Sequence, residues 1–150
     1  MGKINEILAL AKARATDANL PYAGALTPQE AWELLQLIPE ARLVDVRTSA
    51  EWNWVGRVAN SVEIEWVQWP ANQPNPNFLA QLTQQVDKEA VVMFLCRSGV
   101  RSKKAATIAT EAGYTSAYDI LEGFEGDLDA NKHRNRIGGW RFAGLPWIQS

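Results

Sequence analysis

The sequence is poor in the residues that build disulfide frameworks and metal sites. Its 150 residues contain one cysteine, Cys96, and one histidine, His133. A single cysteine cannot form an internal disulfide, which is typical of a reducing compartment. A lone histidine without cysteine partners does not supply the ligands of a structural zinc site. We therefore expect no disulfide scaffold and no metal centre, and we interpret His133, in a polar stretch, as a solvated side chain.

Long apolar runs and a large net charge are also lacking. No stretch reaches the roughly 18 consecutive apolar residues that span a bilayer. Residues 1–20 carry charges throughout and lack the apolar centre of a secretory signal. With 15 basic and 17 acidic residues, the formal net charge is −2, which gives no indication of binding to nucleic acid or to an anionic membrane. We expect a cytoplasmic protein with no nucleic-acid partner and no membrane partner.

The sequence does contain a regular alternation of extended and helical patterns, at a length that suits one domain with a sizeable core. Apolar runs typical of strands occur at 42–46, 61–66, 91–95 and 116–121. Helical patterns occur at 3–15, 27–38, 49–55, 75–86 and 102–112. This alternation predicts an α/β fold, in which helices flank a mostly parallel central sheet on both faces.

Two of the helical patterns begin with recognisable capping residues. Thr27 can cap the helix that follows it, and Glu30 completes a capping box. Pro28 suits the first position of the same helix. Thr48 or Ser49 is the candidate cap of the next one.

The single cysteine lies in the stretch FLCRSGVRS, residues 94–102, between an apolar strand and a helix. Ligands of open α/β sheets bind at the carboxyl ends of the strands. The start of the following helix offers free N–H groups and a partial positive charge, which favour an anion and also a thiolate. Gly99 lets the backbone curl so that successive amides point inward. We therefore interpret Cys96 as a nucleophile in an anion-binding loop, not as a structural core residue.

The charges near this loop support the same interpretation. The segment between Glu89 and Glu111 contains no other acidic residue. It contains four cations, which are Arg97, Arg101, Lys103 and Lys104. Cations in the first turn of a helix are unfavourable, because they oppose the helix dipole. Residues that go against such a local preference often belong to a functional site. We expect a functional role for Arg101, whereas the two lysines are typical of a solvated helix face.

Together with DVR at 45–47 and Glu51, the stretch CRSGVRS at 96–102 resembles the single-domain rhodaneses, which are thiosulfate sulfurtransferase-type proteins. The resemblance covers residues 27–149, so that residues 1–26 are expected to form an N-terminal helical extension of a rhodanese-like domain. In this family the loop is one residue shorter than in related phosphatases, whose loop closes on an arginine. Here Ser102 occupies the position of that arginine, which favours sulfur transfer over phosphate chemistry.

The resemblance implies a covalent mechanism that needs no metal and no organic cofactor. Cys96 would take the outer sulfur of thiosulfate, or of a similar small anionic donor, as a persulfide. The implied substrate-binding residues are Arg97, Ser98, Gly99, Val100, Arg101 and Ser102. Of these, Arg101 would hold the oxyanion of the donor. Because there is no second cysteine, the sulfur must pass to an external acceptor, which is a thiol, cyanide or a partner protein.

Two other functions stay open at this point. A rhodanese-like module could carry a persulfide without turnover, or act as a redox or regulatory binding domain. A phosphatase or arsenate reductase is disfavoured by the length of the loop. Asp45 and Arg47 precede the loop, so we expect structural roles for them: a carboxylate that accepts backbone N–H bonds and an arginine in an ion pair.

The tryptophans are interpreted mainly as packing residues. This applies to Trp32, Trp52, Trp140 and Trp147. Trp66 and Trp69 flank a loop after a strand, so they are expected either in the core or at the mouth of the site.

Overall fold

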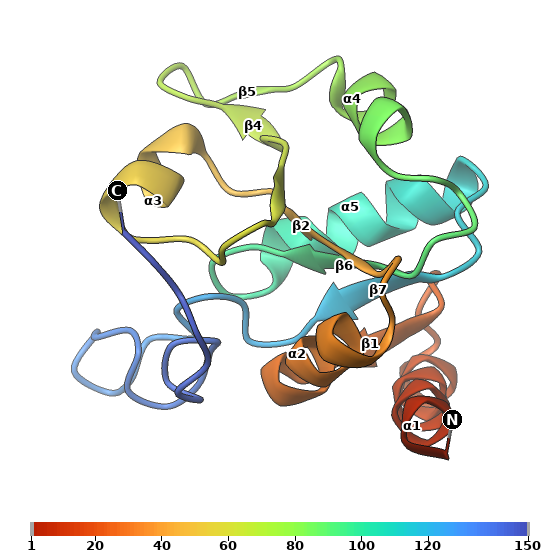
Figure 1. The fold of residues 1–150 in the computed structure, drawn as a ribbon. Coiled ribbons are helices and arrows are strands. Elements are labelled where there is room, and N and C mark those ends of the chain that lie inside the picture. Colours follow the sequence, from red (N-terminus) through yellow and green to blue (C-terminus); the bar gives the residue numbers. More distant parts are fainter. Residues whose placement is uncertain (1, 150) are drawn as a thin grey trace.

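The computed structural model describes residues 2–149, and it is built around a five-stranded sheet (Figure 1). The strands follow the order β1-β7-β6-β2-β3, and every neighbouring pair is parallel. Their bounds are Gly24–Leu26 (β1), Arg42–Asp45 (β2), Val62–Glu63 (β3), Val92–Leu95 (β6) and Ala117–Ile120 (β7). The predicted α/β class with a parallel sheet is confirmed.

Helices cover both faces of the sheet, and each face has its own hydrophobic cluster. The bounds of the helices are Gly2–Ala18 (α1), Pro28–Leu37 (α2), Ser49–Trp54 (α3), Phe78–Gln85 (α4) and Val100–Glu111 (α5). α1 and α2 supply Ile7 and Leu34 to one cluster, whereas α4 and α5 supply Leu82 and Ala106 to the other. The central strand β6 is buried along its whole length, as expected for a parallel strand between two helical layers.

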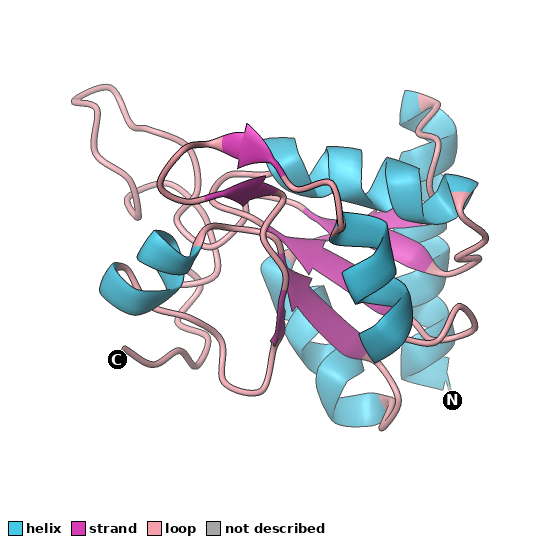
Figure 2. Cartoon of the chain, turned by 90° about the horizontal axis from the view of Figure 1, so that it is seen from above, coloured by secondary structure: helices cyan, strands magenta, loops and turns pink. Residues whose placement is uncertain are grey.

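The long loops gather at one end of the sheet, with α3 and the C-terminal segment (Figure 2). The parallel strands all end toward these loops, so the carboxyl edge of the sheet is the edge that they surround. No helix among residues 2–149 is long and apolar enough to cross a membrane.

The predicted capping residues start their helices as expected. Thr27 accepts a hydrogen bond from the N–H of Glu30, whose carboxylate accepts one from the N–H of Thr27. Thr48 and Glu51 form the same reciprocal pair at the start of α3. These caps depend on residues three positions apart, so the sequence is sufficient to predict them.

Several extended segments differ from the prediction. The expected strand at 61–66 is reduced to the two residues of β3. The loop after it folds into a small antiparallel ribbon of β4 (Val67–Gln68) and β5 (Gln73–Pro74). Strand β1 was not predicted, because a three-residue segment of sequence GAL has little intrinsic strand preference. Its pairing with β7 and its burial stabilise it instead.

The N-terminal helix packs directly on the sheet through Gly24. α1 buries Ile7, Ala11 and Ala15, and its backbone passes so close to β1 that a Cβ on Gly24 would lie 2.7 Å from the carbonyl carbon of Ala11. The division into an extension (1–26) and a domain (27–149) stays a prediction. Residue 1 of this extension lies outside the described residues. The described part of the extension contributes both a helix and an edge strand to the fold.

We predict that Gly24→Ala destabilises the protein by about 1–3 kcal/mol, because the added methyl group forces α1 away from β1. Urea denaturation followed by tryptophan fluorescence measures the change in the free energy of unfolding. Gly2→Ala is the matched control, since nothing lies within 4 Å of a Cβ at that position. If Gly24→Ala were as stable as Gly2→Ala, the close packing of α1 on β1 would be wrong.

Candidate active site

The single thiol lies at the base of a tight loop between β6 and α5. Cys96 follows the last residue of β6 and is 1% exposed. Gly99 caps α5 with a φ of 114°, a backbone conformation that favours glycine. This conformation turns the N–H of Gly99 onto the Cys96 sulfur at 3.1 Å. An N–H at a helix start donating to sulfur stabilises negative charge there, so the loop is suited to hold a thiolate.

The backbone of the segment after β7 supports this loop from behind. The N–H of Phe124 donates to the carbonyl of Cys96 at 2.8 Å, and the N–H of Glu125 donates to the carbonyl of Arg97 at 2.9 Å. Gly123 makes this approach possible, since a Cβ there would lie 2.5 Å from the carbonyl carbon of Arg97. The segment after β7 therefore fixes the position of the carbonyls of Cys96 and Arg97.

A buried ion pair anchors the neighbouring strand end. Asp45 and Arg47 are both fully buried, and the Arg47 guanidinium donates to the Asp45 carboxylate at 2.7 and 2.9 Å. Asp45 also accepts the N–H of Arg47, whereas Arg47 reaches the carbonyl of Gly56 at 2.7 Å. The guanidinium stacks over the ring of Phe124 at 4.3 Å from its centroid. The predicted structural roles of these two residues are confirmed.

Arg101 lies in the first turn of α5 and is paired with Glu51. Two hydrogen bonds of 2.7 and 3.0 Å join the guanidinium to both oxygens of the carboxylate. Burial by itself would raise the pKa of Glu51, but the hydrogen bonds and charge of Arg101 outweigh it and lower that pKa to about 2. The predicted role of Arg101 as the anion-binding residue stays a prediction. In this structure its guanidinium joins α5 to the cap of α3.

Arg97 lies in an open pocket of about 470 Å³ beside the loop, and its side chain is exposed. Trp54 and Trp69 line the same pocket and pack edge to face, with ring centroids 6.4 Å apart. Among the described residues, the Arg97 side chain has no hydrogen-bond or ion-pair partner. A free cation between aromatic walls can receive an anion directly, without first breaking another ion pair.

A chain of hydrogen bonds leads from the thiol into the protein interior. The Cys96 thiol donates to the Ser102 hydroxyl at 3.3 Å, and this hydroxyl donates to an Asp119 carboxylate oxygen at 2.5 Å. Burial raises the pKa of Asp119 to about 7, against the opposing effects of the Ser102 hydrogen bond and the Lys103 charge. Asp119 is the penultimate residue of β7 and was not predicted as part of the site.

Of the predicted binding residues, Gly99 and Ser102 contact the sulfur of Cys96, and Arg97 and Arg101 line the pocket. Ser98 is half-buried, Gly99 and Ser102 are buried, and Val100 is exposed in the first turn of α5. His133 is exposed in the C-terminal loops, as expected for a solvated side chain. Sequence reasoning missed Trp54 and Asp119, and it gave Glu51 no role beyond the motif. Glu51 could have been found from the sequence, because it belongs to the motif that carries the family resemblance.

The predicted packing roles of the tryptophans hold for some of them. Trp140 is fully buried and Trp52 is 9% exposed. Trp147 is more exposed, at 37%, although it packs edge to face on Phe124. Trp66 is partly buried against the core cluster of α4 and α5, whereas Trp69 lies at the mouth of the site.

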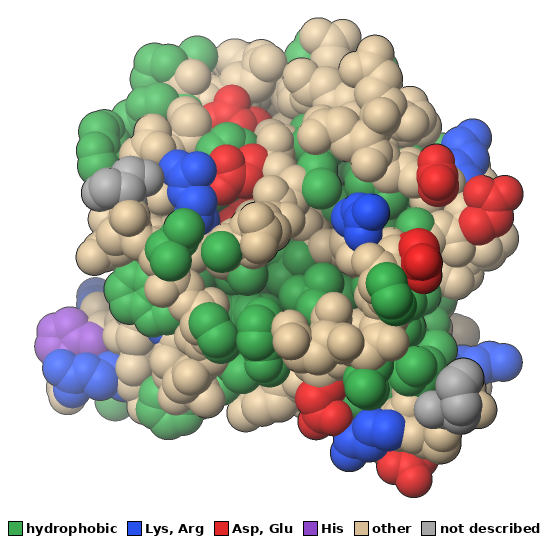
Figure 3. Space-filling model, viewed as in Figure 1, with side chains coloured by type: hydrophobic (Ala, Val, Ile, Leu, Met, Phe, Trp, Pro, Cys, Tyr) green, Lys and Arg blue, Asp and Glu red, His purple; other side chains and the backbone are tan. Residues whose placement is uncertain are grey.

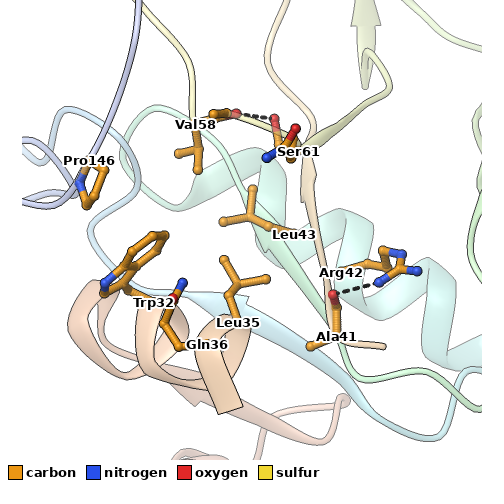
Figure 4. Close-up of a pocket in the computed structure, with 11 residues that line it drawn as sticks. Trp32, Leu35, Gln36, Ala41, Arg42, Leu43, Val58, Ser61 and Pro146 are labelled. Carbon is orange, nitrogen blue, oxygen red and sulfur yellow. Dashed lines mark hydrogen bonds between the residues drawn. The ribbon is translucent and has the colours of Figure 1, made fainter. Parts of the chain in front are cut away.

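A second hollow of about 430 Å³ lies beside α2 and the start of β2 (Figure 4). It forms a mostly hydrophobic depression on the face shown in Figure 3. Trp32, Leu43 and Val58 supply much of its wall. Its cation, Arg42, donates to the carbonyls of Pro39 and Ala41. No residue of the Cys96 loop lines this hollow, whereas Arg97 and Arg101 of the loop line the other pocket. We therefore take the pocket beside the Cys96 loop as the candidate active site.

Comparison with known proteins shows the family of the chain. Residues 27–130 match the family described as Rhodanese-like domain. The crystal structure of Rv0390 from M. tuberculosis is 50% identical, with a TM-score of 0.79 over 86% of this chain and 99% of that chain. An uncharacterized protein of Rickettsia conorii is 37% identical over 121 residues, which is 79% of this chain and 91% of the relative. The thiosulfate sulfurtransferase GlpE of Haemophilus influenzae is 29% identical over 101 residues, covering 67% and 84% of the two chains.

We predict that Glu51→Gln lowers the free energy of unfolding at neutral pH by up to about 3 kcal/mol. This is the stabilisation that the lowered pKa of Glu51 implies for its charged form. A carboxylate whose folded pKa is lowered stabilises the protein above its unfolded pKa, and this contribution is lost as the pH falls. The difference between the two proteins should therefore shrink between about pH 4.5 and about pH 2. Urea denaturation at a series of pH values measures it.

Glu33→Gln is the control for this experiment, because the Glu33 carboxylate is 44% exposed and lies 3.8 Å from Lys3. An exposed pair of this kind contributes about 1 kcal/mol or less. An equal loss in both variants, or a difference that does not depend on pH, would contradict the assigned role of the Glu51–Arg101 pair.

Proposed function

The chain belongs to the rhodanese-like family, and on that basis we propose that it is a sulfurtransferase that uses Cys96 as its nucleophile. The observation that carries the proposal is the loop around the thiol, in which Gly99 directs its N–H onto the Cys96 sulfur at 3.1 Å. A core cysteine would not need a donor of this kind, because a thiol behaves as a small apolar group when it is buried. A thiolate or a persulfide anion does need one.

The proposed reaction has two steps. The Cys96 thiolate attacks the outer sulfur of thiosulfate, a new sulfur–sulfur bond forms, and sulfite leaves with the electron pair of the broken bond. The enzyme then carries a persulfide whose terminal sulfur is anionic. An external thiolate or cyanide attacks this sulfur, and the Cys96 thiolate is regenerated. Cys96 is the single cysteine of the chain, so no internal thiol can resolve the persulfide.

We place the donor in the pocket beside the loop. Arg97 lies at this pocket without a partner among the described residues, and its charge favours the oxyanion end of thiosulfate. Arg101 lines the same pocket, but it is held by Glu51. Arg101 therefore contributes mainly by holding the first turn of α5 in position, whereas Arg97 makes the direct contact.

We predict that Cys96→Ser abolishes sulfur transfer and leaves the fold intact, because a hydroxyl at this position is not ionised and cannot form a persulfide. Release of sulfite from thiosulfate with cyanide as acceptor measures the activity, and circular dichroism checks the fold. Appreciable residual activity in the folded variant would show that Cys96 is not the nucleophile.

The same assay separates the alternative functions. A carrier or sensor module would form one persulfide per chain, detectable by mass spectrometry, and would release sulfite without turnover. A phosphatase would hydrolyse an aryl phosphate, which we do not expect. Multiple turnovers with thiosulfate or with an organic persulfide support the sulfurtransferase, and either of the other results contradicts it.

We further predict that Arg97→Ala raises the KM for thiosulfate about tenfold or more, with a smaller effect on kcat, since a hydrogen bond to a charged group contributes roughly 1.5–3 kcal/mol. Steady-state kinetics measures both constants. Arg136→Ala is the matched control, because Arg136 is exposed in the C-terminal loops, outside the pocket. Equal KM values for the two variants would mean that Arg97 does not contact the donor.

A further inference from the structure

Three buried side chains form an uninterrupted hydrogen-bonded path that the proposed reaction does not yet use. Cys96 follows β6, Ser102 lies in the first turn of α5, and Asp119 belongs to β7. They are 1%, 0% and 0% exposed. We propose that Asp119 is the internal proton acceptor for the Cys96 thiol and acts through the hydroxyl of Ser102. This inference rests on the proposed function, in which Cys96 reacts as a thiolate.

The directions of the hydrogen bonds fit a relay. The thiol donates to the Ser102 oxygen at 3.3 Å, and the Ser102 hydroxyl donates to Oδ1 of Asp119 at 2.5 Å. Both donors thus point along the path from sulfur to carboxylate. The path is closed to solvent, because all three residues are buried. A proton that leaves the sulfur along this path stays inside the protein.

The surroundings of Asp119 favour its protonated form. Its second oxygen, Oδ2, is buried and has no hydrogen-bond partner among the described residues. A buried carboxylate with an unpaired oxygen is costly, and protonation removes that cost. Burial raises the pKa of this group to about 7, although the Ser102 hydrogen bond and the charge of Lys103 oppose the shift.

Two other titratable groups are close enough to interact with this carboxyl group. Lys103, on α5, is a cation that favours the carboxylate. Tyr22 precedes β1, and burial together with the Asp119 charge raises its pKa to about 12. Tyr22 is therefore neutral at physiological pH and does not compete for the proton. The neighbouring strand β1 (Gly24–Leu26) has no titratable side chain.

The proton transfer balances without any further reactant. The thiol proton moves to the Ser102 oxygen as the Ser102 proton moves to Asp119. The thiol and the carboxylate become a thiolate and a carboxylic acid, so the total charge does not change. The acid then donates to Ser102, and the Ser102 hydroxyl donates to the thiolate. The sulfur anion receives one hydrogen bond from Ser102 and another from the N–H of Gly99.

A simple electrostatic role for Asp119 predicts the opposite result. If Asp119 were a fixed negative charge near the sulfur, it would disfavour the thiolate, and its removal would make the thiol more reactive. If it accepts the thiol proton, its removal makes the thiol less reactive. The sign of the change in the Asp119→Asn variant therefore decides between the two roles.

The test is the rate of iodoacetamide alkylation, which reports on Cys96 because the chain has no other cysteine. We expect Asp119→Asn and Ser102→Ala each to slow alkylation at neutral pH about 100-fold, the lower end of what a positioned base contributes. The double variant should be no slower than either single one, because both changes interrupt one path. The rate of the wild-type protein should rise as the pH passes through about 7, where Asp119 loses its proton and can accept one, and should level off above that pH. The rates of the variants should show no such step near pH 7.

Asp87→Asn is the matched control, since Asp87 is exposed and precedes the opposite end of β6. An unchanged or faster rate in Asp119→Asn, or additive losses in the double variant, would overturn the relay. Thermal melting checks that each variant is folded. If Asp119→Asn does not fold, the pH profile of the wild-type rate decides the question, because a rate that does not level off above about pH 7 would overturn the relay. Alkylation needs no sulfur donor, so a failure of the relay is distinguishable from a failure of sulfur transfer, which the thiosulfate assay measures separately.

Discussion

The buried ion pair between Asp45 and Arg47 joins the parts of the molecule that surround the thiol. Asp45 ends β2, which lies beside β6 in the sheet. Arg47 binds the carbonyl of Gly56 after α3 and packs on Phe124, whose N–H holds the carbonyl of Cys96. Because both charges are fully buried, removing either one leaves the other without compensation, at a cost of about 3–5 kcal/mol. The loop geometry therefore depends on this pair.

The two arginines of the loop differ in whether their charge is already paired within the protein. Arg101 is held by Glu51 through two hydrogen bonds and belongs to the supporting structure. Arg97 lies at the pocket beside two tryptophans without a partner among residues 2–149. An anion can approach Arg97 without first breaking an ion pair, so the two arginines of the motif differ in their contacts despite their similar positions.

Much of the fold and part of the site could be predicted from the sequence. The capping boxes at Thr27 and Thr48 were predictable because they involve residues three positions apart. Strand β1 was not, because its pairing with β7 connects segments far apart in the chain. Asp119 was not predictable for a similar reason, since it lies 17 positions from Ser102. An isolated acid in a strand pattern carries no signal of its partner.

The sequence by itself determined the α/β fold and the loop around Cys96, because hydrophobic periodicity, helix caps and the glycine of the loop act over a few neighbouring residues. The motifs at 45–47 and 96–102 indicated the family by resemblance. Only the tertiary structure decided which arginine is free and which carboxyl group is joined to the thiol through hydrogen bonds. Arg101 meets Glu51 across 50 positions of the chain, and Asp119 meets Ser102 where β7 passes beside α5. Ion pairs and hydrogen bonds depend on the distance between groups in space, and the packing of the elements sets that distance.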